Sequence, residues 1–466
     1  MYSRWSNSSV VMTTLLAFYI TSSPCLSAAE CECSSPMGMQ GDHYPYKNVD
    51  VPLVQSLFIK DMIGLGVGNV RTDMFFHWGE VERTKGKYDA ANEGGMQERF
   101  VSQLVISGIR PMLILSYGNP LYEECKGAFP IFCAPASEEA IRAFGEYCYQ
   151  MTSFYRGKVA YWEIWNEPNV GFGYEPPSPQ LYMALVREAS RRIRQADPGA
   201  FIVAGGANAI SKTYQLQHPT WYTAEMWYKQ CFALGLAGLV DAIGVHYYRG
   251  TPEEGEEVIS YLKTLLSQYK AQNIQIWDTE DGYDARQIGE VPKAKNLARL
   301  FLNNYGLGIG KTFWYAMEWN DPRSSRELLG LFDGARNPLA SASAYRAVSQ
   351  VLGECPENIT DKFHGSFEAQ LPVYAGLIRD RLRHYVFRTR RAPRRNLLAV
   401  WLTLSPQQTY PGIPIRARTA SGRVLPLRVL DSLSGQWSSL AEARAKWGLK
   451  KGELVVPDYP LIYEIE

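Results

Sequence analysis

Two glutamates, Glu167 and Glu280, each stand where a short apolar run ends. Glu167 lies in the stretch 159–169 (VAYWEIWNEPN), and Glu280 lies in the stretch 274–282 (IQIWDTEDG). Two carboxylates that face one substrate can hydrolyse a glycosidic bond, because one protonates the leaving oxygen while the other acts as nucleophile or base. We therefore take Glu167 and Glu280 as the candidate catalytic pair.

A single glutamate after a strand is more often a helix N-terminal acid or a surface charge. Two such residues, one of them preceded by Asn166, favour a catalytic role instead. Asp278 and Glu318 also lie near predicted strand ends and are alternatives for the second carboxylate. Strand alternation places Glu163 on the inward face, where a buried carboxylate needs a partner, so we interpret it as structural.

Other residues at the same level could support this pair. Arg71, in 69–73 (NVRTD), could keep a carboxylate ionised, with a surface salt bridge as the alternative. His246, followed by Tyr248 in 244–248 (GVHYY), is expected either in the site or as a hydrogen-bonded rim residue. Trp314 or Trp319 could offer an apolar platform to a sugar ring, with core packing as the alternative.

The elements that position these residues follow a regular order. From about residue 50 to 350, short apolar runs alternate with helical patterns and recur roughly every 40 residues, a spacing that predicts a parallel (β/α)8 barrel over 30–350. Glu167 then ends strand four and Glu280 ends strand seven. Helix starts are predicted after Ser137, at Ser178-Pro179 and near Pro292. The first strand has no clean apolar run and is placed within 37–46.

The sequence pattern changes after about residue 350. Short alternating segments separated by Gly, Pro and Ser turns predict a β-sandwich over 351–466. Within it, the stretch 379–395 holds eight arginines and one acid. We interpret this stretch as a solvated hairpin tip, with contact to an anionic polysaccharide or surface as the alternative.

Composition excludes several classes of protein. The 466 residues carry 48 Lys+Arg against 47 Asp+Glu, so the chain lacks the basic excess of a nucleic-acid binder. A hydrophobic content of 46% argues against disorder. The 12 Trp and 29 Tyr suit surfaces that are apolar on one side and wet on the other, such as those that bind sugars.

Residues 1–29 are typical of a secretory signal peptide, with Arg4, an apolar run over 10–20 and a small-residue cleavage site at Ser27-Ala28-Ala29. That run is too short to span a bilayer, so we expect a secreted or periplasmic protein without a membrane span. An uncleaved anchor is the alternative.

The cysteine pattern favours disulfides over a metal site. Seven of the eight cysteines remain after loss of Cys25, so at least one thiol stays unpaired in a monomer, and Cys125 and Cys133 are expected to close a small loop. Because the chain has neither CxxC pairs nor HExxH, we expect no metal and no cofactor.

Taken in chain order, Arg71, the run 162–169 (WEIWNEPN), the run 244–248 and Thr279-Glu280 resemble the clan A retaining glycoside hydrolases, most nearly family 39. The similarity covers roughly residues 50–350. The family includes β-xylosidases, α-L-iduronidases and bacterial exopolysaccharide endoglycosidases, and the resemblance implies a (β/α)8 barrel with an accessory β-sandwich.

The resemblance also implies roles for individual residues. Glu167 corresponds to the acid/base, Asn166 to the contact with the sugar 2-hydroxyl and Glu280 to the nucleophile, with Arg71 and His246 in support. Two features depart from the family: the first strand lacks its motif, and Asp281 stands where the clan more often has an apolar or aromatic residue. A second acid there would raise the pKa of the nucleophile unless it is turned away.

These observations lead to the hypothesis of a secreted retaining glycoside hydrolase that cleaves an oligo- or polysaccharide by double displacement. Retention predicts carboxyl groups about 5–5.5 Å apart, whereas inversion needs a separation nearer 8 Å. A non-catalytic glycan-binding barrel and a transglycosylase that uses the same residues are the alternatives.

Overall fold

The computed structural model describes residues 34–41, 51–72, 77–91, 95–124, 133–171, 176–317, 319–320, 328–407, 410, 412–419 and 422–466. The predicted signal peptide, Glu318 and Cys125 lie outside these residues. Among the helices of the described ranges, none is both long and apolar enough to cross a membrane.

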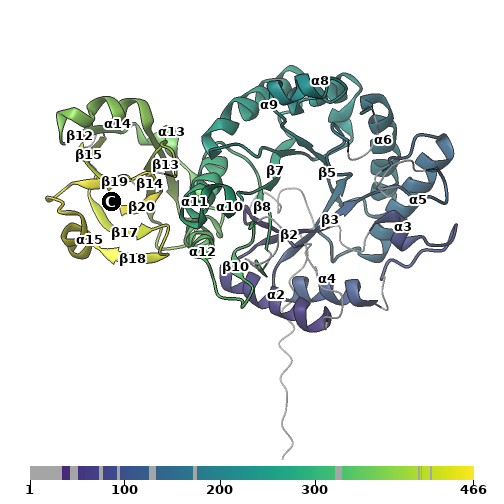
Figure 1. Ribbon diagram of the computed structural model, residues 1–466, viewed down its shortest axis with the longest axis horizontal. Coiled ribbons are helices and arrows are strands. Elements are labelled where there is room, and N and C mark those ends of the chain that lie inside the picture. Colours follow the sequence, from purple (N-terminus) through teal and green to yellow (C-terminus); the bar gives the residue numbers. More distant parts are fainter. Residues whose placement is uncertain are drawn as a thin grey trace, which may run out of the picture.

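Eight parallel strands close into a barrel in chain order (Figure 1). The strands are β1 (Met37–Gln40), β2 (Asn69–Thr72), β3 (Arg110–Leu115), β4 (Tyr161–Ile164), β5 (Phe201–Asn208), β6 (Ala242–His246), β7 (Gln275–Asp281) and β8 (Thr312–Trp314). This closure confirms the predicted (β/α)8 fold. The first strand falls inside the predicted range and pairs with both β2 and β8.

Helices surround the barrel and connect its strands (Figure 1). They are α2 (Val51–Leu65), α3 (Trp78–Val81), α4 (Met96–Ile106), α5 (Glu138–Phe154), α6 (Pro179–Ala196), α7 (Lys212–Gln217), α8 (Ala224–Ala233), α9 (Glu256–Gln268), α10 (Ala285–Ile288), α11 (Glu290–Gly306) and α12 (Ala340–Leu352). The predicted caps form: Ser137 accepts a hydrogen bond from Ala140 N, and Ser178 accepts one from Leu181 N.

Large side chains fill the lower interior of the barrel. The rings of Tyr161 and Phe201 pack against Trp277, with centroids 4.9 and 5.0 Å away. These rings belong to a fully buried cluster that also contains Met112 and Phe313. Because this cluster closes the barrel interior, a substrate can be held only above it, at the carboxyl ends of the strands.

The C-terminal region consists mainly of two antiparallel sheets that share one apolar core. Their strands are β11 (Glu357–Asn358), β12 (Ser366–Ala369), β13 (Leu382–Arg388), β14 (Asn396–Leu402), β15 (Ile413–Thr419), β16 (Gly422–Arg423), β17 (Pro426–Asp431), β18 (Gln436–Ser439), β19 (Leu454–Val456) and β20 (Leu461–Ile465). Short helices complete the region: α13 (Thr360–Phe363), α14 (Ala375–Arg381) and α15 (Leu440–Trp447). The predicted accessory β-domain is therefore present.

The arginine-rich stretch forms the end of α14 and the hairpin between β13 and β14. Several of its arginines have carboxylate partners in the chain: Arg383 contacts Glu256, Arg391 contacts Glu354, and a third arginine, Arg395, contacts Glu464. These intramolecular pairs agree with a solvated, internally paired hairpin.

The cysteines divide into bonded and buried ones. Cys133 is in a disulfide, while its predicted partner Cys125 lies outside the described residues. Cys148 and Cys231 are free thiols within the barrel core, as the odd cysteine count requires of at least one residue.

Candidate active site

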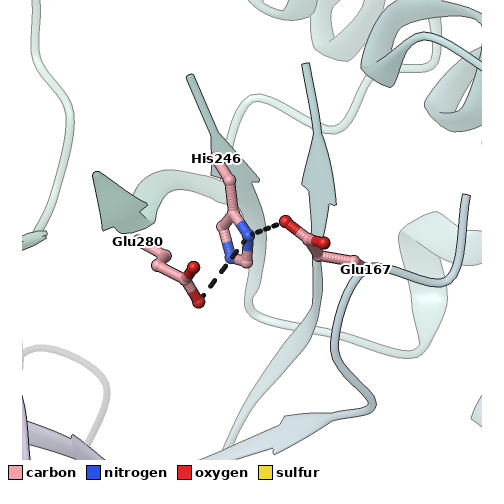
Figure 2. A group of neighbouring side chains, drawn as sticks. All are labelled: Glu167, His246 and Glu280. Carbon is pink, nitrogen blue, oxygen red and sulfur yellow. Dashed lines mark hydrogen bonds and ion pairs between the residues drawn. The ribbon is translucent and has the colours of Figure 1, made fainter. Parts of the chain in front are cut away.

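The structure places both candidate glutamates at the carboxyl end of the barrel, on opposite sides of His246 (Figure 2). Glu280 lies near the end of β7, and Glu167 lies three residues beyond β4 with a φ of 46°. His246 ends β6 between them. The predicted strand numbers of both glutamates, four and seven, agree with these positions.

The two carboxylates lie close together. One ligand-type atom from each of Glu167, His246 and Glu280 falls within 4.8 Å of the others. Nδ1 of His246 is 2.8 Å from Oε1 of Glu167 and 3.9 Å from Oε2 of Glu280. One oxygen of each carboxylate therefore lies closer to the other than the separation of about 6.5–9.5 Å that inverting enzymes keep between their carboxyl groups.

The histidine ring is fixed on both sides. Its other nitrogen, Nε2, is 3.0 Å from Oγ1 of Thr279 on β7. A Cβ at Gly206 of β5 would lie 2.0 Å from that same nitrogen, so only glycine leaves room for the ring. His246 is fully buried, which makes it part of the site wall and not an exposed rim residue.

Arg71 joins both glutamate-bearing strands. Its Nη1 donates to Oε2 of Glu280 at 2.9 Å, and its Nη2 donates to Oδ1 of Asn166 at 2.7 Å. Its Nε donates to Oε2 of Glu163 at 2.6 Å, and Nη1 also reaches Oε1 of Gln40 at 3.0 Å. Because Arg71 is only 1% exposed, these are buried charge-assisted hydrogen bonds, and the surface salt bridge alternative is wrong.

Glu163 has the structural environment that strand alternation predicts. It is fully buried, pairs with Arg71, and accepts a hydrogen bond from Gly206 N at 3.0 Å through its other oxygen. Both oxygens of this carboxylate are therefore satisfied, which leaves the residue as a support for Arg71.

Glu280 is held in its ionised form. Burial alone would raise its pKa, but the charges of His246 and Arg71, together with hydrogen bonds from Tyr248 and Arg71, lower the pKa below the ordinary value. The phenol of Tyr248 donates to Oε1 at 2.6 Å while Arg71 donates to Oε2. Each oxygen of Glu280 therefore has one strong donor.

The two aspartates of β7 have partners other than those of Glu280. The register of β7 against β8 shifts between Asp278 and Asp281, so that Thr279 and Glu280 both serve the site. Asp278 accepts from Asn304 of α11 at 2.8 Å, and Asp281 accepts from Gly282 N at 2.7 Å.

Burial, above all, raises the pKa of Asp278 well above its ordinary value and that of Asp281 to about 7. The adjacent acid is thus itself biased towards protonation, while Glu280 remains ionised. Asp278, considered as an alternative second carboxylate, packs against the helix layer. Glu318, the other alternative, is outside the described residues.

Glu167 is anchored by residues of the fifth strand. Its backbone N–H donates to Gly206 O at 3.0 Å, and Nδ2 of Asn208 donates to its Oε1 at 2.8 Å. Asn208 was not singled out from the sequence. The run 201–208 (FIVAGGAN) does carry the signal, since it ends in a polar residue at the level of the glutamates.

Of the two predicted tryptophan platforms, Trp314 lies in the core and the side chain of Trp319 is not described. Trp314 is fully buried, donates to Leu329 O at 3.3 Å and packs near Tyr283, so its ring serves the core, as the alternative stated. Trp319 lies in the short strand β9 (Trp319–Asn320), and its side chain is outside the described part of the structure.

The three clustered side chains have the donor types of a cation site, but their hydrogen bonds suit a different role. Glu280 is already neutralised by a guanidinium 2.9 Å away, and Oε1 of Glu167 already lies 2.8 Å from both His246 and Asn208. An arginine at that distance from a ligand oxygen would repel a metal ion. The arrangement fits two carboxylates set up for acid–base and nucleophilic work.

Comparison with known proteins identifies the fold. No known family profile matches the sequence, and no curated protein is similar to it in sequence. Solved structures do match. A family 39 glycoside hydrolase from the gut symbiont Bacteroides cellulosilyticus WH2 has a TM-score of 0.67 and 19% identity, covering 94% of this chain and 82% of its own.

Two further structures match over nearly the whole chain. A monomeric β-xylosidase from Caulobacter crescentus CB15 has a TM-score of 0.60 and 14% identity, covering 93% of this chain and 97% of its own. The family 39 enzyme of Xanthomonas axonopodis pv. citri has a TM-score of 0.59 and 15% identity, covering 97% and 99%. This chain shares the fold of clan A glycoside hydrolases. The resemblance inferred from the sequence motifs is confirmed at that level.

Proposed function

We propose that the protein is a retaining glycoside hydrolase with Glu280 as nucleophile and Glu167 as acid/base. The observation that carries this proposal is that one oxygen of each carboxylate lies within 4.8 Å of the other at the carboxyl end of the barrel. That distance suits direct attack by one carboxylate, since inverting enzymes keep their carboxyl groups about 6.5–9.5 Å apart.

The two glutamates have partners that suit different roles. Glu280 accepts hydrogen bonds from a guanidinium and a phenol, which favour the ionised, nucleophilic form. Glu167 contacts the amide of Asn208 and the imidazole of His246, and its described hydrogen bonds include none from a guanidinium. Unequal environments are the general means by which one carboxyl serves as acid while its neighbour serves as nucleophile.

The reaction then proceeds in two displacements. An oxygen of Glu280 forms a bond to the anomeric carbon as the bond between this carbon and the leaving oxygen breaks. The leaving oxygen takes the proton of Glu167. Water next attacks the anomeric carbon while Glu167 removes its proton, and the bond to Glu280 breaks. We assign to Asn166, which accepts a hydrogen bond from Arg71, the contact with the sugar 2-hydroxyl.

We further propose that the substrate is an oligo- or polysaccharide and that the protein acts outside the cytoplasm. The second proposal rests on the signal-like residues 1–29. The first rests on the two glutamates and on the solved structures that share the fold, among which are a β-xylosidase and a GH30 endoxylanase.

The test is a screen of the mature protein and its Glu280→Gln variant against aryl glycosides, beginning with β-xylosides, and against plant and bacterial polysaccharides. Turnover by the parent with a loss of more than about 1,000-fold in the variant supports the proposal. Retention of the anomeric configuration, followed by NMR, is expected. Binding of a polysaccharide without turnover by either protein would favour the glycan-binding barrel instead.

A further inference from the structure

A group of aromatic rings, one exposed and two partly buried, lies on the segment that follows β5. Its members are Tyr214 on α7, His218 and Trp221, which we call the 214–221 aromatic cluster. The ring of His218 stacks on Trp221 at 4.4 Å, and Tyr214 lies 4.6 Å from His218. Tyr214 is 44% exposed, and the neighbouring Leu216 is 78% exposed. Tyr214, His218 and Trp221 belong to none of the buried core clusters of the described residues.

Both ends of this segment are hydrogen-bonded to the loop that carries Glu167. At its start, Asn208 donates to Oε1 of Glu167 at 2.8 Å. At its end, Tyr222 N donates to Asn169 O at 3.1 Å, and the side chain of Asn169 donates to Tyr222 O at 2.7 Å. Asn169 also bonds the backbone of Asn208 through both its amide atoms. The two ends of the segment that carries the cluster are therefore held against the loop of the acid/base.

The position of Glu167 defines which part of a substrate would reach the cluster. An acid/base must contact the leaving oxygen, so the departing portion of the substrate lies on its side of the cleft. Glu280, on β7, approaches the anomeric carbon from elsewhere in the barrel. Loops anchored to Glu167 therefore border the leaving group and not the sugar that becomes attached to the enzyme.

We propose that the 214–221 aromatic cluster is a carbohydrate subsite for the leaving-group portion of an oligosaccharide or polysaccharide. Sugar rings have apolar C–H faces and polar hydroxyl rims, and aromatic side chains with polar tips match both. Solvent-accessible rings on a segment that is hydrogen-bonded to the loop of a catalytic residue are suited to a binding surface. This inference rests on the proposed hydrolase function and extends it by favouring substrates with polymeric leaving groups.

The experiment compares Trp221→Ala and Tyr214→Ala with the parent on two substrates of the same sugar. One is the aryl glycoside that the parent cleaves, whose leaving group ends beside Glu167, and the other is the matching oligosaccharide series of two to six units. We expect kcat/KM for the longer oligosaccharides to fall about 10-fold through KM, while the aryl glycoside value stays within about twofold.

Matched controls separate stacking from general damage. Tyr261→Ala removes a tyrosine of similar exposure (39%) on α9 and should leave both substrates unaffected. Trp221→Phe keeps a ring and should recover most of the oligosaccharide activity. If Trp221→Ala fails to fold by circular dichroism, the more exposed Tyr214→Ala carries the test. Equal losses on both substrates, or no loss on either, would overturn the subsite.

A binding measurement keeps this test independent of turnover. If the parent cleaves no substrate, the proposed hydrolase function fails, and affinity electrophoresis in gels containing xylan or other polysaccharides tests the cluster alone. Retardation of the parent that is lost in Trp221→Ala, but kept in Tyr261→Ala, supports a carbohydrate subsite. Equal retardation of parent and variant, or no retardation in any gel, rejects it.

Discussion

At the residue scale, the different donors around Glu167 and Glu280 decide their proposed roles. Arg71 and Tyr248 bind separate oxygens of Glu280, and the charge of Arg71 helps to lower its pKa. Glu167 has no such pairing with a guanidinium among the described contacts, and its closest partners are Asn208 and His246. The same residue type is thus assigned two functions because its neighbours differ.

Replacing Glu167 with alanine should affect substrates unequally. We expect Glu167→Ala to lower kcat/KM by about 100- to 10,000-fold for glycosides with poor leaving groups, because these need protonation of the leaving oxygen. The leaving group of an activated aryl glycoside departs without that proton, so kcat/KM for these substrates should fall much less in the first step. Steady-state kinetics on a series of leaving groups measures this difference, and equal losses across the series would contradict the assignment of Glu167.

Removing the phenolic donor to Glu280 should move the acid limb of the pH profile. The hydrogen bond from Tyr248 stabilises ionised Glu280, so Tyr248→Phe raises the pKa of Glu280. Activity that requires ionised Glu280 is then lost at a higher pH as the solution is acidified, by about 1 pH unit. The measurement is kcat/KM against pH, with Tyr261→Phe as control, and an unmoved limb would show that Tyr248 has no such role.

The residue types at strand ends were enough to predict the candidate site, but the contacts of these residues could not be predicted from the sequence. The glutamates, Arg71 and His246 stood out because each followed an apolar run at the expected spacing. Asn208 and Gly206 did not, since their importance depends on strand pairing between β5 and its neighbours. Trp314 shows the reverse error, because a tryptophan near a strand end suits a sugar platform and a packed core equally well.

At the element scale, β7 carries three acidic residues whose environments differ. Glu280 contacts Arg71 and Tyr248 in the site, whereas Asp278 is buried against Asn304 of α11 and Asp281 is buried with a hydrogen bond from Gly282 N. The register shift against β8 produces this separation. The sequence predicted strand seven and its end but not the shift, because register depends on contacts with a partner strand that alternation within one segment does not specify.

The buried Asp281 should make stability depend on pH. Its pKa is raised to about 7, chiefly by burial, so the folded protein binds a proton there that the unfolded chain releases above about pH 4. The stabilisation is fully present below about pH 4 and declines as the pH rises towards 7. Above pH 7 it is lost, and stability no longer depends on this group. Asp281→Asn cannot ionise and should keep the stabilisation at high pH.

We therefore expect the advantage of Asp281→Asn over the parent to grow by about 2 kcal/mol between pH 5 and pH 8. Urea unfolding at several pH values measures it. The exposed Asp361, in Asp361→Asn, is the control, because the same chemical change there should leave the difference between variant and parent independent of pH. A variant that tracked the parent at every pH would show that Asp281 is not protonated in the fold.

At the scale of the whole molecule, the barrel and the C-terminal sheets share one buried core. Tyr385, Phe387 and Trp401 of the sheets belong to the same apolar cluster as the inner faces of α11 and α12. Figure 1 shows the two parts side by side at these helices. The change from alternating strands and helices to short strand-like segments near residue 350 predicted a second region. The sequence did not predict that the two regions share a core, because an apolar segment looks the same whichever neighbour covers it.

Polar contacts fix the same junction. Arg299 of α11 pairs with Glu253 and donates to Leu404 O at 2.9 Å. Lys295 of the same helix pairs with Asp458 at 2.6 Å, and both side chains are almost completely buried. Charges taken out of water are tolerated only while they remain paired, so the two regions are expected to unfold together.

Breaking the Lys295–Asp458 pair should therefore destabilise the entire chain. Asp458→Ala removes the carboxylate opposite a buried ammonium, and we expect a loss of about 3–5 kcal/mol. Calorimetry should show one transition at lower temperature, because the shared core couples both regions. Glu139→Ala, which breaks the exposed pair with Lys85, is the control and should leave the transition almost unmoved. Two resolved transitions, with only the smaller one shifted by Asp458→Ala, would instead mean that the sheets unfold independently and that the junction does not stabilise the barrel.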